Sequence, residues 1–168
     1  MIHAHDVLEI VVGLHSAQIA IWLDGGWGVD ALLGEQKRAH DDLDVIISLS
    51  DGDAAIQALS RLGFAIAADE RPTRFVVRDG GDRRIDCHPV TFDGEGGGVQ
   101  QMTNGDSWRY PAHGFSGCGV VAGKAVRCLS PEVQLLCHHR NQPDNTDRHD
   151  MLLLAERFGQ TLTEPFGS

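Results

Sequence analysis

Hydrophobic positions recur along the chain with two periods, one typical of helices and the other of strands. Between residues 6 and 18 they return at helical spacing, and Asp6 and Glu9 are placed as a cap and its partner at the start of that helix. A short apolar run over residues 19–23 stops at a pair of glycines, which predicts a buried strand that ends in a tight turn. A short helix over residues 27–33 is expected to follow.

Strands and helices remain interleaved as far as residue 92. Branched and alternating apolar residues predict strands, and apolar positions at helical spacing predict a helix that stops at a glycine. The strands are expected over residues 42–47, 64–67, 74–78 and 84–90, and the helix over residues 54–62. Because the last two strands flank a Gly-Gly turn, they should pair antiparallel.

The pattern is less regular after residue 92. Residues 93–116 are rich in glycine and predict either a long loop or a set of short strands. A small hairpin is expected over residues 120–126. Helices are predicted from the Ser-Pro-Glu sequence at residues 130–132 and over residues 147–158.

The length of 168 residues, with no visible linker or internal repeat, predicts a single domain. Within it we expect a catalytic α/β core over residues 1–92 and a loop-rich, helical acceptor-side extension over residues 93–168. The expected fold class is therefore α/β (α+β), with a mixed sheet flanked by helices and a short helical C-terminal segment.

Charge and composition narrow the class of partner. Fourteen basic against 24 acidic side chains give a net charge of −10, which works against binding to a nucleic-acid backbone. No run approaches the roughly 20 apolar residues that cross a bilayer, and the first residues lack the pattern of a signal peptide. The four cysteines show no C-x-x-C spacing, so disulfides are not expected. We therefore expect a cytoplasmic protein that binds neither nucleic acid nor membrane.

Two aspartates stand at the start of the strand predicted over residues 42–47. Asp42 and Asp44 are two residues apart, so their side chains leave the same face of the strand about 7 Å apart at their backbones. Two such carboxylates repel unless a cation lies between them, and oxygen ligands of this kind suit Mg²⁺. A solvated strand end is the competing interpretation. The Gly25–Gly26 turn upstream favours the metal site, because glycines and the first amides of a helix let phosphates come close.

Four further residues are candidates for the same chemistry. Asp86 is a third carboxylate, placed in mid-strand between apolar neighbours, where a charge needs a partner. His88, two residues later, faces the same side and is placed either to contact an acceptor or to support a carboxylate. Arg38 and His40 are placed to neutralise phosphate oxygens. An edge-strand carboxylate, a half-buried histidine and solvated loop side chains are the corresponding structural alternatives.

These residues resemble a known family. The segment over residues 22–34, followed by Arg38, His40 and the paired aspartates, is similar to the signature of antibiotic nucleotidyltransferases in the DNA polymerase β-type superfamily. Within it the chain most resembles the small lincosamide nucleotidyltransferases and next the aminoglycoside 2″-O-nucleotidyltransferases. Residues 86–89 look like the third-aspartate strand of the lincosamide branch. The Gly-Ser pair of the wider superfamily is Gly-Gly here, which is the form of the resistance branch. The likeness is faint over residues 93–128, where the acceptor would lie.

The resemblance implies a polymerase β-type nucleotidyltransferase fold and a reaction. The reaction would transfer a nucleoside monophosphate, AMP from ATP, to a hydroxyl of a small antibiotic, a lincosamide before an aminoglycoside, and release pyrophosphate. Two Mg²⁺ ions and a homodimer are implied as well. The implied residues are Asp42, Asp44 and Asp86 as metal ligands, with Asp86 also able to act as general base; Gly25, Gly26, Arg38 and His40 around the nucleotide; and His88, Arg74 and Tyr110 on the acceptor side.

Alternatives from other classes remain at this point. Aspartate-nucleophile phosphohydrolases also have Asp-x-Asp at a strand, but at its C-terminal end, whereas here the predicted strand continues after Asp44. A non-catalytic nucleotide-binding module, or a toxin-partner protein on the same fold, would keep the architecture without the reaction. A zinc site among His138, His139, His149 and Asp150 lacks a known ligand spacing, so a solvated helix face is expected there.

Overall fold

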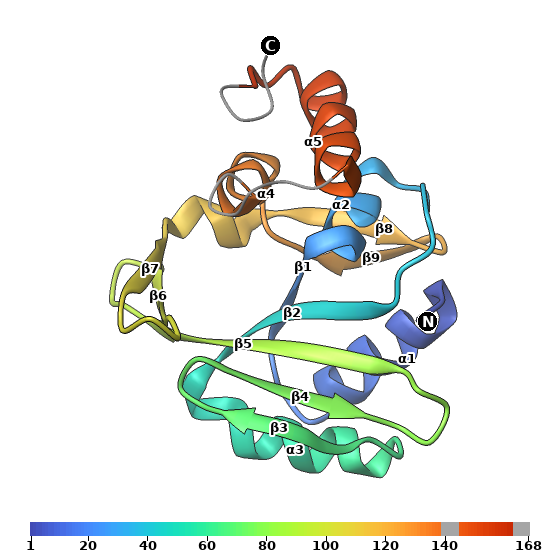
Figure 1. The fold of residues 1–168 in the computed structure, drawn as a ribbon, viewed down its shortest axis with the longest axis vertical. Helices are drawn as coiled ribbons and strands as arrows, with labels where there is room; N and C mark the ends of the chain where they lie inside the picture. Colours follow the sequence, from blue (N-terminus) through green and yellow to red (C-terminus); the bar gives the residue numbers. More distant parts are fainter. Residues whose placement is uncertain (139–144, 163–168) are drawn as a thin grey trace.

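A mixed β-sheet occupies the middle of the fold (Figure 1). In the computed structural model, which describes residues 1–138 and 145–162, its main path has the order β1-β2-β5-β4-β3. The five strands are β1 (Ile21–Asp24), β2 (Asp42–Ser48), β3 (Ala65–Glu70), β4 (Arg74–Arg78) and β5 (Arg84–Phe92). β2 and β5 run parallel, and the other neighbouring pairs on this path are antiparallel. The expected mixed sheet and the expected antiparallel pair are both confirmed.

The main core lies on one face of this sheet. Helices α1 (Ala4–Ser16) and α3 (Gly52–Arg61) contact each other and pack against that face. Leu43, Val45 and Ile47 of β2 point into this core and are fully buried, as the alternation along the strand predicts. Asp42 and Asp44 therefore share the opposite face of β2. The burial of one face thus fixes which way the carboxylates point.

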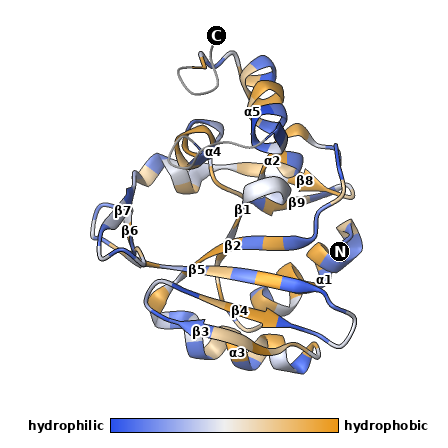
Figure 2. Cartoon of the chain, in the orientation of Figure 1, coloured by the Kyte–Doolittle hydropathy of each residue, from blue (hydrophilic) through white to orange (hydrophobic). Residues whose placement is uncertain are grey.

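The remaining helices gather beyond the β1 edge of the sheet (Figure 1). They are α2 (Gly25–Leu33), α4 (Pro131–His138) and α5 (Asn145–Phe158), and α2 contacts both of the others as well as β1 and β2. Hydrophobic and hydrophilic residues are mixed along α5 in Figure 2. This is expected for a helix that buries one side against its neighbours. In the part of the chain that the structure describes, no helix has the length and apolar character needed to cross a bilayer.

The region after residue 92 contains short strands rather than one long loop. β6 (Gly98–Gln101) pairs with the end of β5, and β7 (Ser107–Tyr110) pairs with β6. The short helix η2 (Ala112–Ser116) leads to the predicted hairpin, formed by β8 (Cys118–Val121) and β9 (Lys124–Arg127). Another short helix, η1 (Leu49–Asp51), links β2 to α3. The glycine-rich segment thus extends the sheet at β5.

Two predicted helix starts need correction. α1 begins at Ala4, and Asp6 is not its cap: His3 is the N-cap, and the Asp6 carboxylate accepts a hydrogen bond from the His3 N–H at 2.9 Å. α2 begins at Gly25, two residues before the predicted start. There the Asp24 carboxylate accepts a hydrogen bond from the Gly25 N–H at 2.8 Å, which caps the helix directly at the end of β1. The glycine pair is therefore the first turn of a helix.

Candidate active site

Strand register places three carboxylates in one row across the sheet. Asp24 on β1 lies opposite Asp44 on β2, and Asp44 lies opposite Asp86 on β5. All three are on the face that points away from the main core, because their chain neighbours Leu23, Leu43 and Ile85 are buried in it. Asp24 belongs to this row as well, although the sequence pattern predicts no role for it. Its position at the end of an apolar strand, directly before the two glycines, is the one signal that points to it.

Asp44, Asp86 and His88 form a cluster of possible metal ligands. Each offers one ligand atom, and these atoms lie within 4.8 Å of one another. His88 Nε2 is 3.2 Å from Asp44 Oδ1. Asp86 is 5% exposed, and its Oδ1 has no hydrogen-bond partner within residues 1–138 and 145–162. A buried carboxylate oxygen without a donor is what a hard cation would satisfy. The residues therefore fit a divalent metal.

Asp42 lies beside this cluster rather than inside it. It faces Arg84 across β2 and β5, with 3.3 Å between Asp42 Oδ2 and Arg84 Nη1. Burial and the charge of Asp44 raise the pKa of Asp42, while Arg84 opposes the rise. Arg84 Nη2 also donates to Asp86 Oδ2 at 2.8 Å. One guanidinium thus bridges the first and third aspartates of the predicted metal set.

The start of α2 closes one side of the carboxylate row. Gly25 has a φ of +55°, and a Cβ there would lie 2.5 Å from Asp44 Oδ2. A Cβ on Gly26 would lie 2.4 Å from His40 Nδ1 and 2.5 Å from Arg38 Nη2. A side chain at residue 25 would thus meet both backbone strain and Asp44, and one at residue 26 would force Arg38 and His40 to shift; the start of the helix lies beside Asp44.

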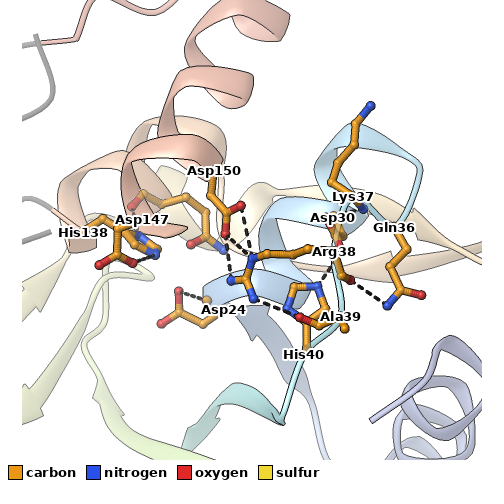
Figure 3. A network of polar contacts seen from close by, with 12 residues as sticks. Asp24, Asp30, Gln36, Lys37, Arg38, Ala39, His40, His138, Asp147 and Asp150 are labelled. Carbon is orange, nitrogen blue, oxygen red and sulfur yellow. Dashed lines mark hydrogen bonds and ion pairs between the residues drawn. The ribbon is translucent and has the colours of Figure 1, made fainter. Parts of the chain in front are cut away.

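Arg38 and His40 both lie against this turn, but they differ in exposure and in their bonding partners (Figure 3). Arg38 is partly exposed and forms a two-pronged ion pair with Asp150 of α5. His40 is 4% exposed, bonded through Nε2 to buried Asp30 and packed against Trp27 with ring centroids 4.9 Å apart. Trp27 and Asp30 thus hold the loop in place, and the Nδ1 side of His40 faces Gly26.

The three predicted acceptor-side residues lie at different depths. His88 borders the carboxylate row; burial would lower its pKa, but the bond to Asp44 raises it. Arg74 bonds to Glu70 at 2.7 Å and lies 3.6 Å from Asp86 Oδ2. Tyr110 is 4% exposed, and its hydroxyl donates to Oε1 of Gln100. The amide nitrogen of Gln100 is in turn 3.4 Å from Nδ1 of His88. Tyr110 therefore lies behind His88 instead of lining an open surface.

A hollow opens in front of Asp44 and His88, between the sheet and the C-terminal helices. Its lining is Asp24, Gly25, Asp44, His88, Cys137, His138 and Asp147. His138 of α4 and Asp147 of α5 face each other, with 3.7 Å between His138 Nε2 and Asp147 Oδ1. The solvated helix face expected here is wrong for Asp150, which is 2% exposed, whereas His149 is exposed. His139 lies outside the described residues.

Comparison with known proteins decides the family. A family model described as aminoglycoside-2″-adenylyltransferase matches residues 6–154. The chain belongs to the aminoglycoside-2″-adenylyltransferase family. It is 31% identical to a lincosamide resistance protein of Staphylococcus haemolyticus over 134 residues, 80% of this chain and 83% of that protein. It is 27% identical to a 2″-aminoglycoside nucleotidyltransferase of Klebsiella pneumoniae over 124 residues, 74% of this chain and 66% of that protein.

Solved structures agree with this assignment. The lincosamide antibiotic adenylyltransferase LnuA, lincomycin-bound, superposes with a TM-score of 0.78 at 28% identity, over 88% of this chain and 93% of that one. ANT(2″)-Ia in complex with adenylyl-2″-tobramycin gives a TM-score of 0.75 at 22% identity, over 93% and 89%, which supports the fold alone. The chain is thus an enzyme of the antibiotic nucleotidyltransferase family, and the expected resemblance, fold class and enzyme class are confirmed.

Proposed function

We propose that this protein transfers AMP from ATP to a hydroxyl of a small antibiotic, a lincosamide before an aminoglycoside, in a magnesium-dependent reaction that releases pyrophosphate. The observation that carries the proposal is the row of Asp24, Asp44 and Asp86 beside the glycine start of α2. This arrangement combines a place for cations with a helix N-terminus that binds anions. The preference for lincosamides rests on the 31% identity to a lincosamide resistance protein.

The chain's own residues would position the nucleotide. We assign the phosphates to the start of α2 at Gly25 and Gly26: neither residue has a side chain to block the approach, and Gly26 would offer its amide, because the Gly25 N–H is bonded to Asp24. Arg38 would add a guanidinium at the same turn, and His40 would hold the loop through Asp30. In-line phosphoryl transfer needs mainly such positioning and neutralisation of charge.

The carboxylates would serve the reacting atoms. Asp44 and Asp86 would hold Mg²⁺, and Asp42, which lies beside them and faces Arg84, would complete the predicted ligand set; the ion when bound supplies charge neutralisation at the phosphates. The acceptor oxygen would attack the α-phosphorus, and the bond from that phosphorus to the bridging oxygen would break as pyrophosphate leaves. Among the described residues nothing donates to Asp86 Oδ1, and this oxygen would serve either as a third ligand or as the base that takes the hydroxyl proton. His88 and Arg74 would border the acceptor from β5 and β4.

Direct assay tests this proposal. The protein is incubated with α-labelled ATP, Mg²⁺ and panels of lincosamides and aminoglycosides, and drug-AMP adducts are sought by mass spectrometry. We expect adducts together with pyrophosphate. Release of inorganic phosphate without an adduct, or no adduct with any acceptor, would overturn the proposal.

The Asp44→Asn substitution tests the site. It removes one charge from the cluster without changing shape, so we expect the transfer rate to fall by about 10³-fold or more with an unchanged circular dichroism spectrum. Asp53→Asn is the matched control, because Asp53 is exposed on α3, away from the carboxylate row. Its rate should stay at the wild-type value. An active Asp44→Asn enzyme would contradict the assigned role.

A further inference from the structure

The ion pair between Arg38 and Asp150 joins two segments that are 112 residues apart in the chain. Asp150 Oδ2 accepts from Arg38 Nη2 at 2.8 Å and from Nε at 3.1 Å (Figure 3). The Asp150 side chain is 3% exposed, whereas that of Arg38 is 32% exposed. A carboxylate so deeply buried requires a cationic partner, and Arg38 supplies it. The pair therefore fixes the arginine in place.

The geometry of the guanidinium shows which of its donors are left. A guanidinium carries five N–H groups: one on Nε and two on each Nη. Asp150 takes the Nε–H and one Nη2–H, and the Ala39 carbonyl oxygen accepts from Nη1 at 3.2 Å. Within the part of the chain that the structure describes, this leaves one N–H on each Nη. Those two form the fork that matches two oxygens of a phosphate.

This fork lies at the helix start that would receive phosphates. A Cβ on Gly26 would meet Arg38 Nη2 at 2.5 Å, as well as the His40 ring, so the guanidinium lies against the first turn of α2. A guanidinium that already holds this orientation does not lose side-chain freedom when an anion binds.

We propose that Asp150 is a positioning residue for the nucleotide: by holding the Nε edge of Arg38, it aims the remaining guanidinium donors at the phosphates and makes helix α5 part of the nucleotide site. This inference rests on the proposed function. It predicts that the loss of Asp150 weakens binding of the phosphates and leaves the acceptor side unaffected. It also predicts that this loss has no effect once Arg38 itself is absent.

Calorimetric titration with Mg²⁺ and α,β-methylene-ATP, repeated with inorganic tripolyphosphate, tests the proposal. Asp150→Asn keeps the shape of the side chain but removes its charge, so we expect the Kd to rise about tenfold for both probes. Glu156→Gln is the matched control: the same loss of charge on the same helix, at an exposed position, should leave both Kd values unchanged. In steady state with ATP, Asp150→Asn should raise the KM for the nucleotide and leave the KM for the acceptor unaltered.

Combination with Arg38→Ala separates positioning from a general loss of structure. The Arg38→Ala and Arg38→Ala/Asp150→Asn proteins should have the same Kd, because Asp150 acts through Arg38. A further tenfold loss in the double variant, or a wild-type Kd for Asp150→Asn, would overturn the inference while leaving the proposed function in place. A wild-type protein that binds neither probe would overturn the proposed function and this inference with it.

Discussion

Backbone geometry and space together explain the glycine at residue 25, and space alone explains the one at residue 26. Gly25 combines a left-handed φ with a position against Asp44, and Gly26 lies against the side chains of Arg38 and His40. Gly34 also has a positive φ, of 78°, but within the described part of the chain nothing lies within 4 Å of the place where its Cβ would be. It ends α2 at the opposite end from the site. Gly26 and Gly34, at opposite ends of α2, are thus glycines for different physical reasons.

This difference gives a prediction for the pair Gly26→Ala and Gly34→Ala. The methyl group on residue 26 would displace Arg38 and His40, so we expect the nucleotide Kd to rise by about tenfold or more. Gly34→Ala should cost about 1–2 kcal/mol of unfolding free energy through its positive φ and leave the Kd unchanged. Calorimetry and urea unfolding measure the two quantities. Equal Kd values for both variants would show that the space at Gly26 is not needed for nucleotide binding.

At the scale of one element, the start of α1 shows how a local cap becomes part of the tertiary structure. Asp6 accepts the His3 N–H and also the Nη1–H of Arg83, which lies in the turn between β4 and β5. Burial would raise the pKa of Asp6, but the His3 N–H and Arg83 outweigh it and hold the pKa below its ordinary value. The ionised carboxylate therefore ties α1 to the β4–β5 turn.

The lowered pKa predicts the sign of a pH effect. A carboxyl with a lower pKa in the folded state stabilises the protein above the pKa of the unfolded chain, near 4, and this contribution is lost as pH falls further. The unfolding free energy of Asp6→Asn, followed by urea titration between pH 7 and pH 3, should therefore depend less on pH than that of the wild type. Glu95→Gln, at an exposed loop position, should keep the wild-type dependence. Parallel curves for Asp6→Asn and wild type would refute the assignment.

For the whole molecule, the docking of α5 is the contact that completes the site. Val29 of α2 and Leu135 of α4 form a buried cluster with Met151 and Leu154 of α5. The same helix carries Asp150 to Arg38 and Asp147 to the hollow in front of Asp44. The apolar cluster and the polar contacts therefore depend on one another.

Two leucines of α5 test how far stability rests on this docking. Leu154 is fully buried, so Leu154→Ala should lower the unfolding free energy by about 2–5 kcal/mol. Leu152, on the same helix, is 54% exposed, and Leu152→Ala should change it by no more than about 0.5 kcal/mol. Urea unfolding measures both values. Similar losses for the two variants would mean that α5 does not pack as described.

Much of the local structure follows from the sequence because its signals are local. The alternation in β2 predicts that Leu43 and Val45 are buried and that Asp42 and Asp44 share the other face, and the structure shows this. α2 begins two residues before the predicted start, because the capping carboxylate of Asp24 stands at the end of an apolar run and is therefore assigned to the strand.

The contacts among the site residues could not be predicted from the sequence. Periodicity fixes the face of a strand but not its neighbour, so only the pairing of β2 with β1 and β5 selects Asp24 and Asp86 to flank Asp44. Asp150 has no local pattern that relates it to Arg38, and Gln100 has none that relates it to His88. The sequence by itself determined most of the helices and strands up to residue 92, the face of the carboxylates of β2 and the place of the glycine pair, because each depends on neighbours within a few residues. Register and helix docking depend on burial across the whole chain, and these decided which groups meet.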